Sequence, residues 1–129
     1  MKNDSLRILI VDDEKSMQKL LWNILSLAGF DVMLASNEAE FRECVFTHNP
    51  HIIILDIMLG EKDGITIYED LLQHGLDSKI PVIFLSALAE DRPPSFPEPG
   101  KRYALLGKPF DADKLVDRLQ KLTGSLALT

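Results

Sequence analysis

Asp56 stands directly after four consecutive apolar residues, Ile52 to Leu55, in the sequence HIIILDIMLGEKDG. This short run of β-branched and aliphatic side chains lies between a proline and a polar, glycine-containing segment, which indicates a strand buried on both faces. A carboxylate buried there at random would be costly. Open α/β sheets bind their ligands beyond the carboxyl ends of the strands, so Asp56 is a candidate for chemistry.

Four further polar residues stand at or just beyond the ends of other apolar runs: Asp12, Asp13, Ser86 and Lys108. Parallel strands point their carboxyl ends to one edge of a sheet, so we expect these residues to converge with Asp56. Three carboxylates close together repel one another, and a hard divalent cation such as Mg²⁺ would keep them ionised. The hydroxyl of Ser86 and the ammonium of Lys108 could hold oxygens of a phosphoryl group bound to Asp56.

Each of these residues also has an ordinary structural interpretation. Asp12 or Asp13 could cap the helix that follows the first strand. Ser86 could be a loop hydroxyl and Lys108 a solvated charge. Their joint position at the strand ends of one sheet favours a functional site over these separate explanations.

Strands and helices alternate along the chain and must position these residues. Apolar runs predict strands at about residues 6–11, 30–35, 52–55, 80–85 and 103–106, and helical spacing predicts helices at about 15–28, 39–48, 64–74 and 111–122. In the second helix Phe41, Val45 and Phe46 are expected to face the core. The alternation implies parallel pairing through right-handed crossovers, hence an α/β fold with a doubly wound five-stranded parallel sheet.

Residues 92–100, RPPSFPEPG, interrupt this pattern with prolines at positions 93, 94, 97 and 99. A continuous helix cannot run through them. We expect the fourth helix to be shortened or replaced by an extended cover over the fourth and fifth strands, with Phe96 turned inward as an anchor.

The bulk properties are those of one soluble domain. A chain of 129 residues with 46% hydrophobic content can bury one substantial core, expected at about residues 6–122. The net charge of −6 disfavours direct binding to nucleic acid or to an anionic membrane. Cys44 is the single cysteine and is expected to be a small buried hydrophobe. We expect no signal peptide or membrane span, and a cytoplasmic location.

At these residues the sequence resembles the receiver domains of two-component response regulators, such as the chemotaxis protein CheY. The resemblance is carried by LRILIVDDE, by IIILDIML followed by Asp63 and Gly64, by SA at residues 86–87, and by GKPF at residues 107–110. It implies a CheY-like, flavodoxin-like sheet with strand order 2-1-3-4-5. It also implies that Asp56 accepts a phosphoryl group from a phosphohistidine on a sensor histidine kinase or a histidine phosphotransfer protein.

The resemblance implies roles for the other residues as well. The Mg²⁺ ligands would be the carboxylates of Asp12, Asp13 and Asp56 and the backbone carbonyl of Met58. Ser86 and Lys108 would read the phosphorylated state, and the peptide bond from Lys108 to Pro109 would be cis.

Two positions depart from the family pattern. Gly60 stands where the family usually has proline, and Leu105 stands where it commonly places its switch aromatic, with Tyr103 two residues earlier. If Leu105 cannot swing between buried and exposed positions, phosphorylation would have to be sensed by movement of the cover formed by residues 92–100. The alternative is that this cover is rigid and that the protein works mainly as a phosphate relay.

Two other function classes are open to the same fold. A phosphohydrolase of the aspartyl-phosphate type also uses an aspartate after a buried strand, but it needs a second acid two residues on, where this chain has Met58. A flavin-binding electron carrier would need a phosphate loop rich in Gly, Ser and Thr after the first strand, where DDEKS would repel phosphate.

We therefore predict a phosphoacceptor receiver rather than an enzyme that acts on a diffusible substrate. No effector domain is recognised, so output is expected through contacts of the receiver surface with another protein. The alternative that these residues belong to a longer protein stays open.

Overall fold

In a computed structural model of the chain, residues 6–87 and 103–122 are described. The central sheet consists of β1 (Arg7–Val11), β2 (Asp31–Ala35), β3 (Ile52–Asp56), β6 (Val82–Ser86) and β7 (Tyr103–Gly107). These strands are all parallel and lie in the order β2-β1-β3-β6-β7. Counted within this sheet, the order is 2-1-3-4-5, so the predicted doubly wound fold is confirmed.

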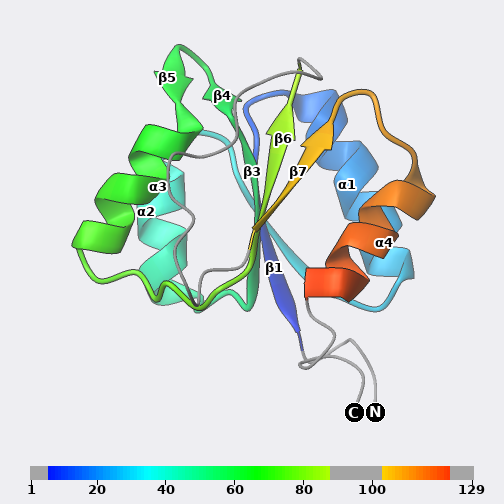
Figure 1. Cartoon of the computed structure of the whole chain (residues 1–129), viewed down its shortest axis with the longest axis horizontal. Coiled ribbons are helices and arrows are strands. Elements are labelled where there is room, and N and C mark those ends of the chain that lie inside the picture. The colour runs from blue at the N-terminus through cyan, green and yellow to red at the C-terminus, as the bar shows by residue number, and fades with distance from the viewer. Residues whose placement is uncertain (1–5, 88–102, 123–129) are drawn as a thin grey trace.

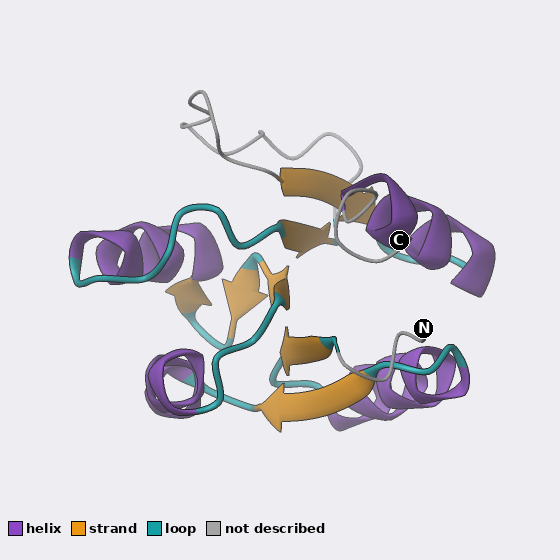
Figure 2. Cartoon of the chain, turned by 90° about the horizontal axis from the view of Figure 1, so that it is seen from below, coloured by secondary structure: helices purple, strands orange, loops and turns teal. Residues whose placement is uncertain are grey.

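Helices cover both faces of the sheet. The described helices are α1 (Lys15–Leu27), α2 (Glu38–Thr47), α3 (Gly64–Gln73) and α4 (Ala112–Leu122). α2 and α3 lie on one face, and α1 and α4 lie on the other (Figures 1 and 2). None of the helices in the described part of the chain is long and apolar enough to cross a bilayer.

The central strand β3 is buried along its whole length. Ile53 and Leu55 belong to the hydrophobic cluster under α2 and α3, whereas Ile52 and Ile54 belong to the cluster under α1 and α4. Successive side chains of a strand point to opposite faces, so a strand covered on both sides is apolar at every position. Asp56 is the exception, and it is the last residue of the strand.

In α2, the helical spacing of apolar residues predicts one core position wrongly. Phe41 and Val45 are buried, as expected, but Phe46 is 47% exposed, so its predicted core position is wrong. Phe41 and Val45 are four residues apart and share one face, whereas the next residue is rotated away from that face. Cys44 is partly buried rather than fully buried, and it packs against the cluster under α2 and α3.

A two-stranded antiparallel hairpin, absent from the predicted elements, follows β3. It consists of β4 (Met58–Leu59) and β5 (Lys62–Asp63), and its turn contains Gly60 with φ of 64°. Proline fixes φ near about −65° and could not adopt this left-handed conformation. The departure from the family pattern at Gly60 therefore has a conformational reason.

The proline-rich segment 92–100 lies outside the described residues. The expected replacement of the fourth helix, the cover over the fourth and fifth strands and the inward position of Phe96 all fall on that segment.

Candidate functional site

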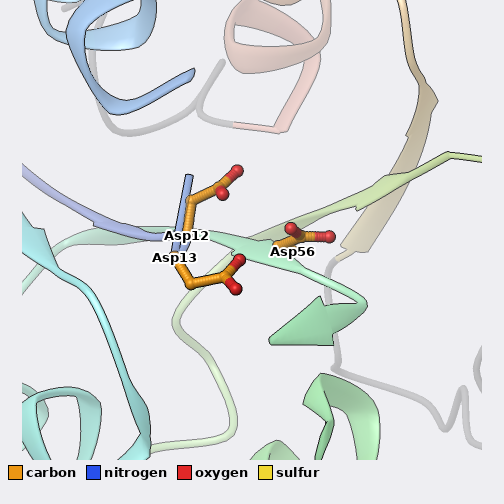
Figure 3. Close-up of side chains that lie close together, drawn as sticks. All are labelled: Asp12, Asp13 and Asp56. Atoms are coloured by element: carbon orange, nitrogen blue, oxygen red, sulfur yellow. The ribbon is translucent and has the colours of Figure 1, made fainter. Parts of the chain in front are cut away.

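Three aspartates meet at the carboxyl edge of the sheet. Asp12 and Asp13 follow β1, and Asp56 ends β3, which pairs directly with β1. One carboxylate oxygen from each residue lies within 4.8 Å of the others (Figure 3). The parallel topology therefore produces the convergence that the strand ends predict.

The three carboxylates have different surroundings. Asp12 is fully buried and Asp56 is 6% exposed, whereas Asp13 is exposed. Asp12 Oδ1 accepts a hydrogen bond from the Glu14 N–H at 2.9 Å, and Asp56 Oδ1 accepts one from the Met58 N–H at 3.1 Å. Among the described residues, Asp12 Oδ2 has no hydrogen-bond partner.

The backbone of Asp12 is held by a residue that the sequence did not single out. The buried Gln18 of α1 donates from Nε2 to the Asp12 carbonyl oxygen at 2.6 Å and to Ser36 Oγ at 2.9 Å. This side chain ties α1 to the ends of β1 and β2. In the sequence, the signal for a structural role of Gln18 is the position of this polar residue on the apolar face of the first helix.

Lys108 faces the carboxylates rather than solvent. Its Nζ lies 3.3 Å from Asp56 Oδ2 and 3.5 Å from Asp12 Oδ2, and its side chain is only 17% exposed. The Lys108 N–H donates to the Ser86 carbonyl oxygen at 2.7 Å, which joins the ends of β6 and β7. The peptide bond between Lys108 and Pro109 is cis, the form that the family resemblance implies.

Burial and charge shift the pKa values of these groups. Burial, with a smaller contribution from the neighbouring Asp56 carboxylate, raises the pKa of Asp12 to about 6, against the opposing effects of the Glu14 N–H and Lys108. Burial also raises the pKa of Asp56, against the opposing effect of Lys108. Burial by itself would lower the pKa of Lys108, but Asp12 and Asp56 together raise it. Asp12 and Asp56 therefore bind a proton more tightly than ordinary aspartates even with the lysine beside them.

The site fits a hard divalent cation by the chemistry of its donors. It offers carboxylate oxygens on three residues, including the buried Asp12 Oδ2, and oxygen is the ligand atom that Mg²⁺ prefers. Buried carboxylates that repel one another are stabilised by such an ion.

Ser86 and Leu105 lie on neighbouring strands. Ser86 ends β6 and is 2% exposed. Leu105 is partly buried, pairs with Phe84 in the register of β6 and β7, and packs against the cluster under α2 and α3. The Tyr103 ring packs edge-on against Phe84, with ring centroids 6.3 Å apart.

Gly64 lies directly against the backbone of Asp56. A Cβ atom at this position would collide with the carbonyl oxygen of Asp56, and the Gly64 N–H donates to the Ile57 carbonyl oxygen at 2.6 Å. Asp63, just before it, caps α3 by accepting a hydrogen bond from the Ile65 N–H. The Asp-Gly pair therefore lets α3 begin directly against the backbone of Asp56.

Curated relatives of this chain are transcriptional regulators. The transcriptional regulatory protein GltR of Pseudomonas aeruginosa is 33% identical over 124 residues, which cover 95% of this chain and 50% of GltR. The DNA-binding dual master transcriptional regulator RpaA of Synechocystis is 33% identical over 118 residues, which cover 90% of this chain and 48% of RpaA. The chain thus spans about half the length of these relatives. They lend no support to the expectation that nucleic acid is not a partner.

Solved structures share the fold. The N-terminal domain of a response regulator/sensory box/GGDEF three-domain protein from Carboxydothermus hydrogenoformans is 30% identical with a TM-score of 0.74, and the match covers 92% of this chain and 94% of that one. The receiver domain of sensor histidine kinase PA1611 from Pseudomonas aeruginosa, solved with a magnesium ion in its active-site cleft, is 23% identical with a TM-score of 0.79 and coverages of 92% and 98%.

The family model described as the response regulator receiver domain matches residues 8–120. That range contains the three aspartates, Ser86 and Lys108, and it takes in all the strands of the central sheet except the first residue of β1. The chain belongs to the family of response regulator receiver domains.

Proposed function

We propose that Asp56 accepts a phosphoryl group from a phosphohistidine on a sensor histidine kinase or a histidine phosphotransfer protein. The observation that carries this proposal is the position of the Asp56 carboxylate at the end of the central strand, beside Asp12 and Asp13 and 3.3 Å from Lys108 Nζ. Family membership supports it, because receiver domains of response regulators accept phosphoryl groups from histidine kinases.

In this transfer a carboxylate oxygen of Asp56 attacks the phosphorus atom. The bond between phosphorus and the histidine nitrogen breaks, and its electron pair stays on the imidazole of the partner. The product is an acyl phosphate on Asp56. Lys108 would hold one oxygen of the phosphoryl group through its ammonium, and Ser86 would hold another through its hydroxyl.

The proposed Mg²⁺ ligands are the carboxylates of Asp12, Asp13 and Asp56 and the backbone carbonyl of Met58. The bound ion would neutralise charge on the phosphoryl oxygens during transfer. The buried Asp12 Oδ2 favours such an ion, because it has no hydrogen-bond partner among the described residues and its ion pair with Lys108 is long, at 3.5 Å.

A phosphohydrolase of the aspartyl-phosphate type is less well supported. That chemistry needs an acid two residues after the nucleophile, to protonate the leaving group. Met58 stands there; the residue is 56% exposed, and its thioether cannot donate a proton. The relatives described above are regulators rather than enzymes that act on small molecules.

The proposal extends to how the signal leaves the domain. A receiver domain spanning about residues 6–122 would act in the cytoplasm. It would pass the signal on through its surface, or through further parts of a longer protein, since the match covers only 48% of the DNA-binding regulator RpaA. The Leu105 side chain offers no hydrogen-bonding group, so a switch at this position would depend on packing alone.

The assignment of Asp56 is tested by incubation with a small phosphodonor and Mg²⁺, which should give a covalent adduct on the wild type and none on Asp56→Asn.

A further inference from the structure

The β4–β5 hairpin lies close to two of the proposed metal ligands, Asp56 and Asp13. At its start, the Met58 N–H donates to Asp56 Oδ1, and the Met58 carbonyl is itself a proposed ligand. At its turn, a Cβ atom on Gly60 would lie 3.9 Å from Asp13 Oδ2. A displacement of the hairpin would therefore move the Met58 carbonyl relative to both aspartates.

The hairpin is too short to hold its own shape. Each strand has two residues, paired as Met58 with Asp63 and Leu59 with Lys62. A hairpin of this size is not stable in isolation. Leu59 is 3% exposed and packs in the core, which anchors the inner side of the hairpin. On the outer side, the Lys62 side chain is 64% exposed and reaches another element.

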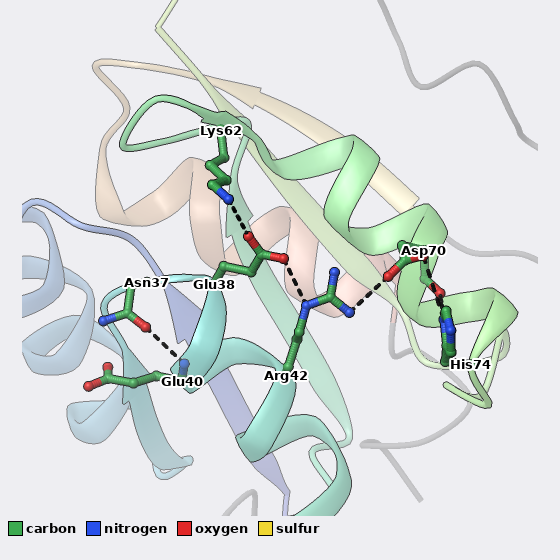
Figure 4. Close-up of polar contacts among 7 residues, drawn as sticks. All are labelled: Asn37, Glu38, Glu40, Arg42, Lys62, Asp70 and His74. Carbon is green, nitrogen blue, oxygen red and sulfur yellow. Dashed lines mark hydrogen bonds and ion pairs between the residues drawn. The ribbon is translucent and has the colours of Figure 1, made fainter.

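That element is α2. Lys62 Nζ lies 3.0 Å from Glu38 Oε1, while the other oxygen of Glu38 accepts from Arg42 Nε at 2.8 Å. Arg42 Nη1 in turn lies 2.8 Å from Asp70 Oδ2 on α3 (Figure 4). Hydrogen bonds from Lys62 and then Arg42 lower the pKa of Glu38. The carboxylate that receives Lys62 is therefore held in place by residues outside the hairpin.

The same ion pair borders the metal site. A surface hollow of about 380 Å³ is lined by Asp13 together with Gly60, Glu38 and Lys62. The ion pair and the proposed metal ligand Asp13 thus line the same hollow. Exposed ion pairs contribute little to global stability, even where they are linked, as this one is to Arg42 and Asp70. Its effect here would be on the position of the hairpin rather than on the fold.

We propose that Lys62 and Glu38 are positioning residues for the metal site: their ion pair fixes the β4–β5 hairpin against α2 and thereby holds the Met58 carbonyl in place as a ligand. The inference rests on the proposed function, because it assumes the divalent cation. Neither residue is itself a ligand.

A purely electrostatic role and a positioning role predict opposite effects of replacing Lys62. If Lys62 acted only through its charge, Lys62→Met would remove a cation near the aspartates and tighten Mg²⁺ binding. If it positions the hairpin, the same substitution would weaken binding. Lys15 provides a matched control, because it lies beside the aspartates in sequence and contacts Ser36 Oγ at 3.4 Å rather than the hairpin.

The test measures the Mg²⁺ dissociation constant of the full chain by calorimetric titration. We expect Lys62→Met to weaken binding by about two- to fivefold, which is the range an exposed ion pair can supply and less than residues that orient metal ligands usually contribute. Lys62→Arg should stay close to the wild-type value, because it keeps the ion pair. Lys15→Met should bind as tightly as the wild type or more tightly.

A second measurement needs no metal. Hydrogen exchange of the peptide covering residues 57–64 should be faster in metal-free Lys62→Met than in the wild type. Unchanged exchange, or Lys62→Met binding Mg²⁺ as tightly as the wild type, would each overturn the positioning role. A wild type that takes no Mg²⁺ would overturn the proposed function itself and the positioning role with it. The two failures are therefore distinguishable.

Discussion

Lys108 Nζ lies 3.3 Å from Asp56 Oδ2, although 52 residues separate the two along the chain. They meet because β3 and β7 both flank β6 and end at the same edge of the sheet. The contact puts a positive charge beside carboxylates whose burial already raises their pKa values. Lys108 therefore neutralises part of the charge that a divalent cation would otherwise meet.

The first prediction concerns Lys108. Lys108→Ala should retain Mg²⁺ binding and, at low salt, should bind the ion at least as tightly as the wild type. The substitution removes a neighbouring positive charge and leaves all the proposed ligands in place. A Mg²⁺ titration of the purified variant checks this expectation. Loss of affinity in Lys108→Ala would contradict the separation of metal binding from phosphoryl binding.

The second prediction concerns Asp13. Asp13→Ala should abolish measurable Mg²⁺ binding while leaving the fold intact, because the residue is a proposed ligand and its side chain is exposed. We expect its free energy of unfolding to change by less than about 0.5 kcal/mol, as for most surface substitutions. Asp31→Ala is the control, since it removes an exposed aspartate from the opposite end of the sheet. Mg²⁺ binding by Asp13→Ala at wild-type affinity would rule out the proposed ligand set.

The third prediction follows from the pKa of Asp12. Its value of about 6 in the folded protein lies above the ordinary 3.8, so the folded protein holds this proton more tightly than the unfolded chain does. Tighter binding of this proton stabilises the folded state below pH 3.8, and the stabilisation is lost as the pH rises to about 6. The metal-free wild type is therefore destabilised by Asp12 at neutral pH.

Asp12→Asn should remove this cost. In metal-free buffer at about pH 7.5 we expect the variant to be more stable than the wild type by about 1 to 3 kcal/mol, and the gap should shrink at about pH 5. Urea unfolding at the two pH values measures the difference. A gap of the same size at both values would mean that ionisation of Asp12 is not its cause.

The fourth prediction concerns Gly64. Gly64→Ala should lower the free energy of unfolding by about 2 to 4 kcal/mol, because the added methyl group meets the backbone of Asp56 and cannot be relieved by a side-chain rotation. Gly75→Ala is the matched control. Gly75 has φ of 110° and open space around it, so only backbone strain of about 1 kcal/mol is expected. Thermal unfolding of both variants checks the contrast, and an equal loss in the two would show that the close approach at Gly64 has no special cost.

Hydrophobic pattern and topology were enough to predict the sheet and the meeting of its acidic residues. The apolar run Ile52 to Leu55 favours a strand covered on both faces, and parallel pairing then brings Asp12, Asp13 and Asp56 to one edge. That inference needed no distances, because all parallel strands end at the same edge of the sheet; the order of the strands came from the family resemblance.

Other features of the structure leave no recognisable pattern in the sequence. Strands of two residues, as in the β4–β5 hairpin, are too short for alternation to show. The exposed Phe46 is indistinguishable by type from the buried Phe41, since the side of a helix that faces the sheet depends on how the helix docks. The ion pairs that join Lys62, Glu38 and Asp70 depend on the same docking, because these residues lie on three different elements.

The most direct test of the central claim is the mass of the intact protein after incubation with a small phosphodonor. The wild type should gain one covalent phosphoryl adduct in the presence of Mg²⁺ and much less after chelation. Asp56→Asn should gain none under the same conditions. An adduct of equal yield on Asp56→Asn would contradict the assignment of Asp56 as the phosphoacceptor.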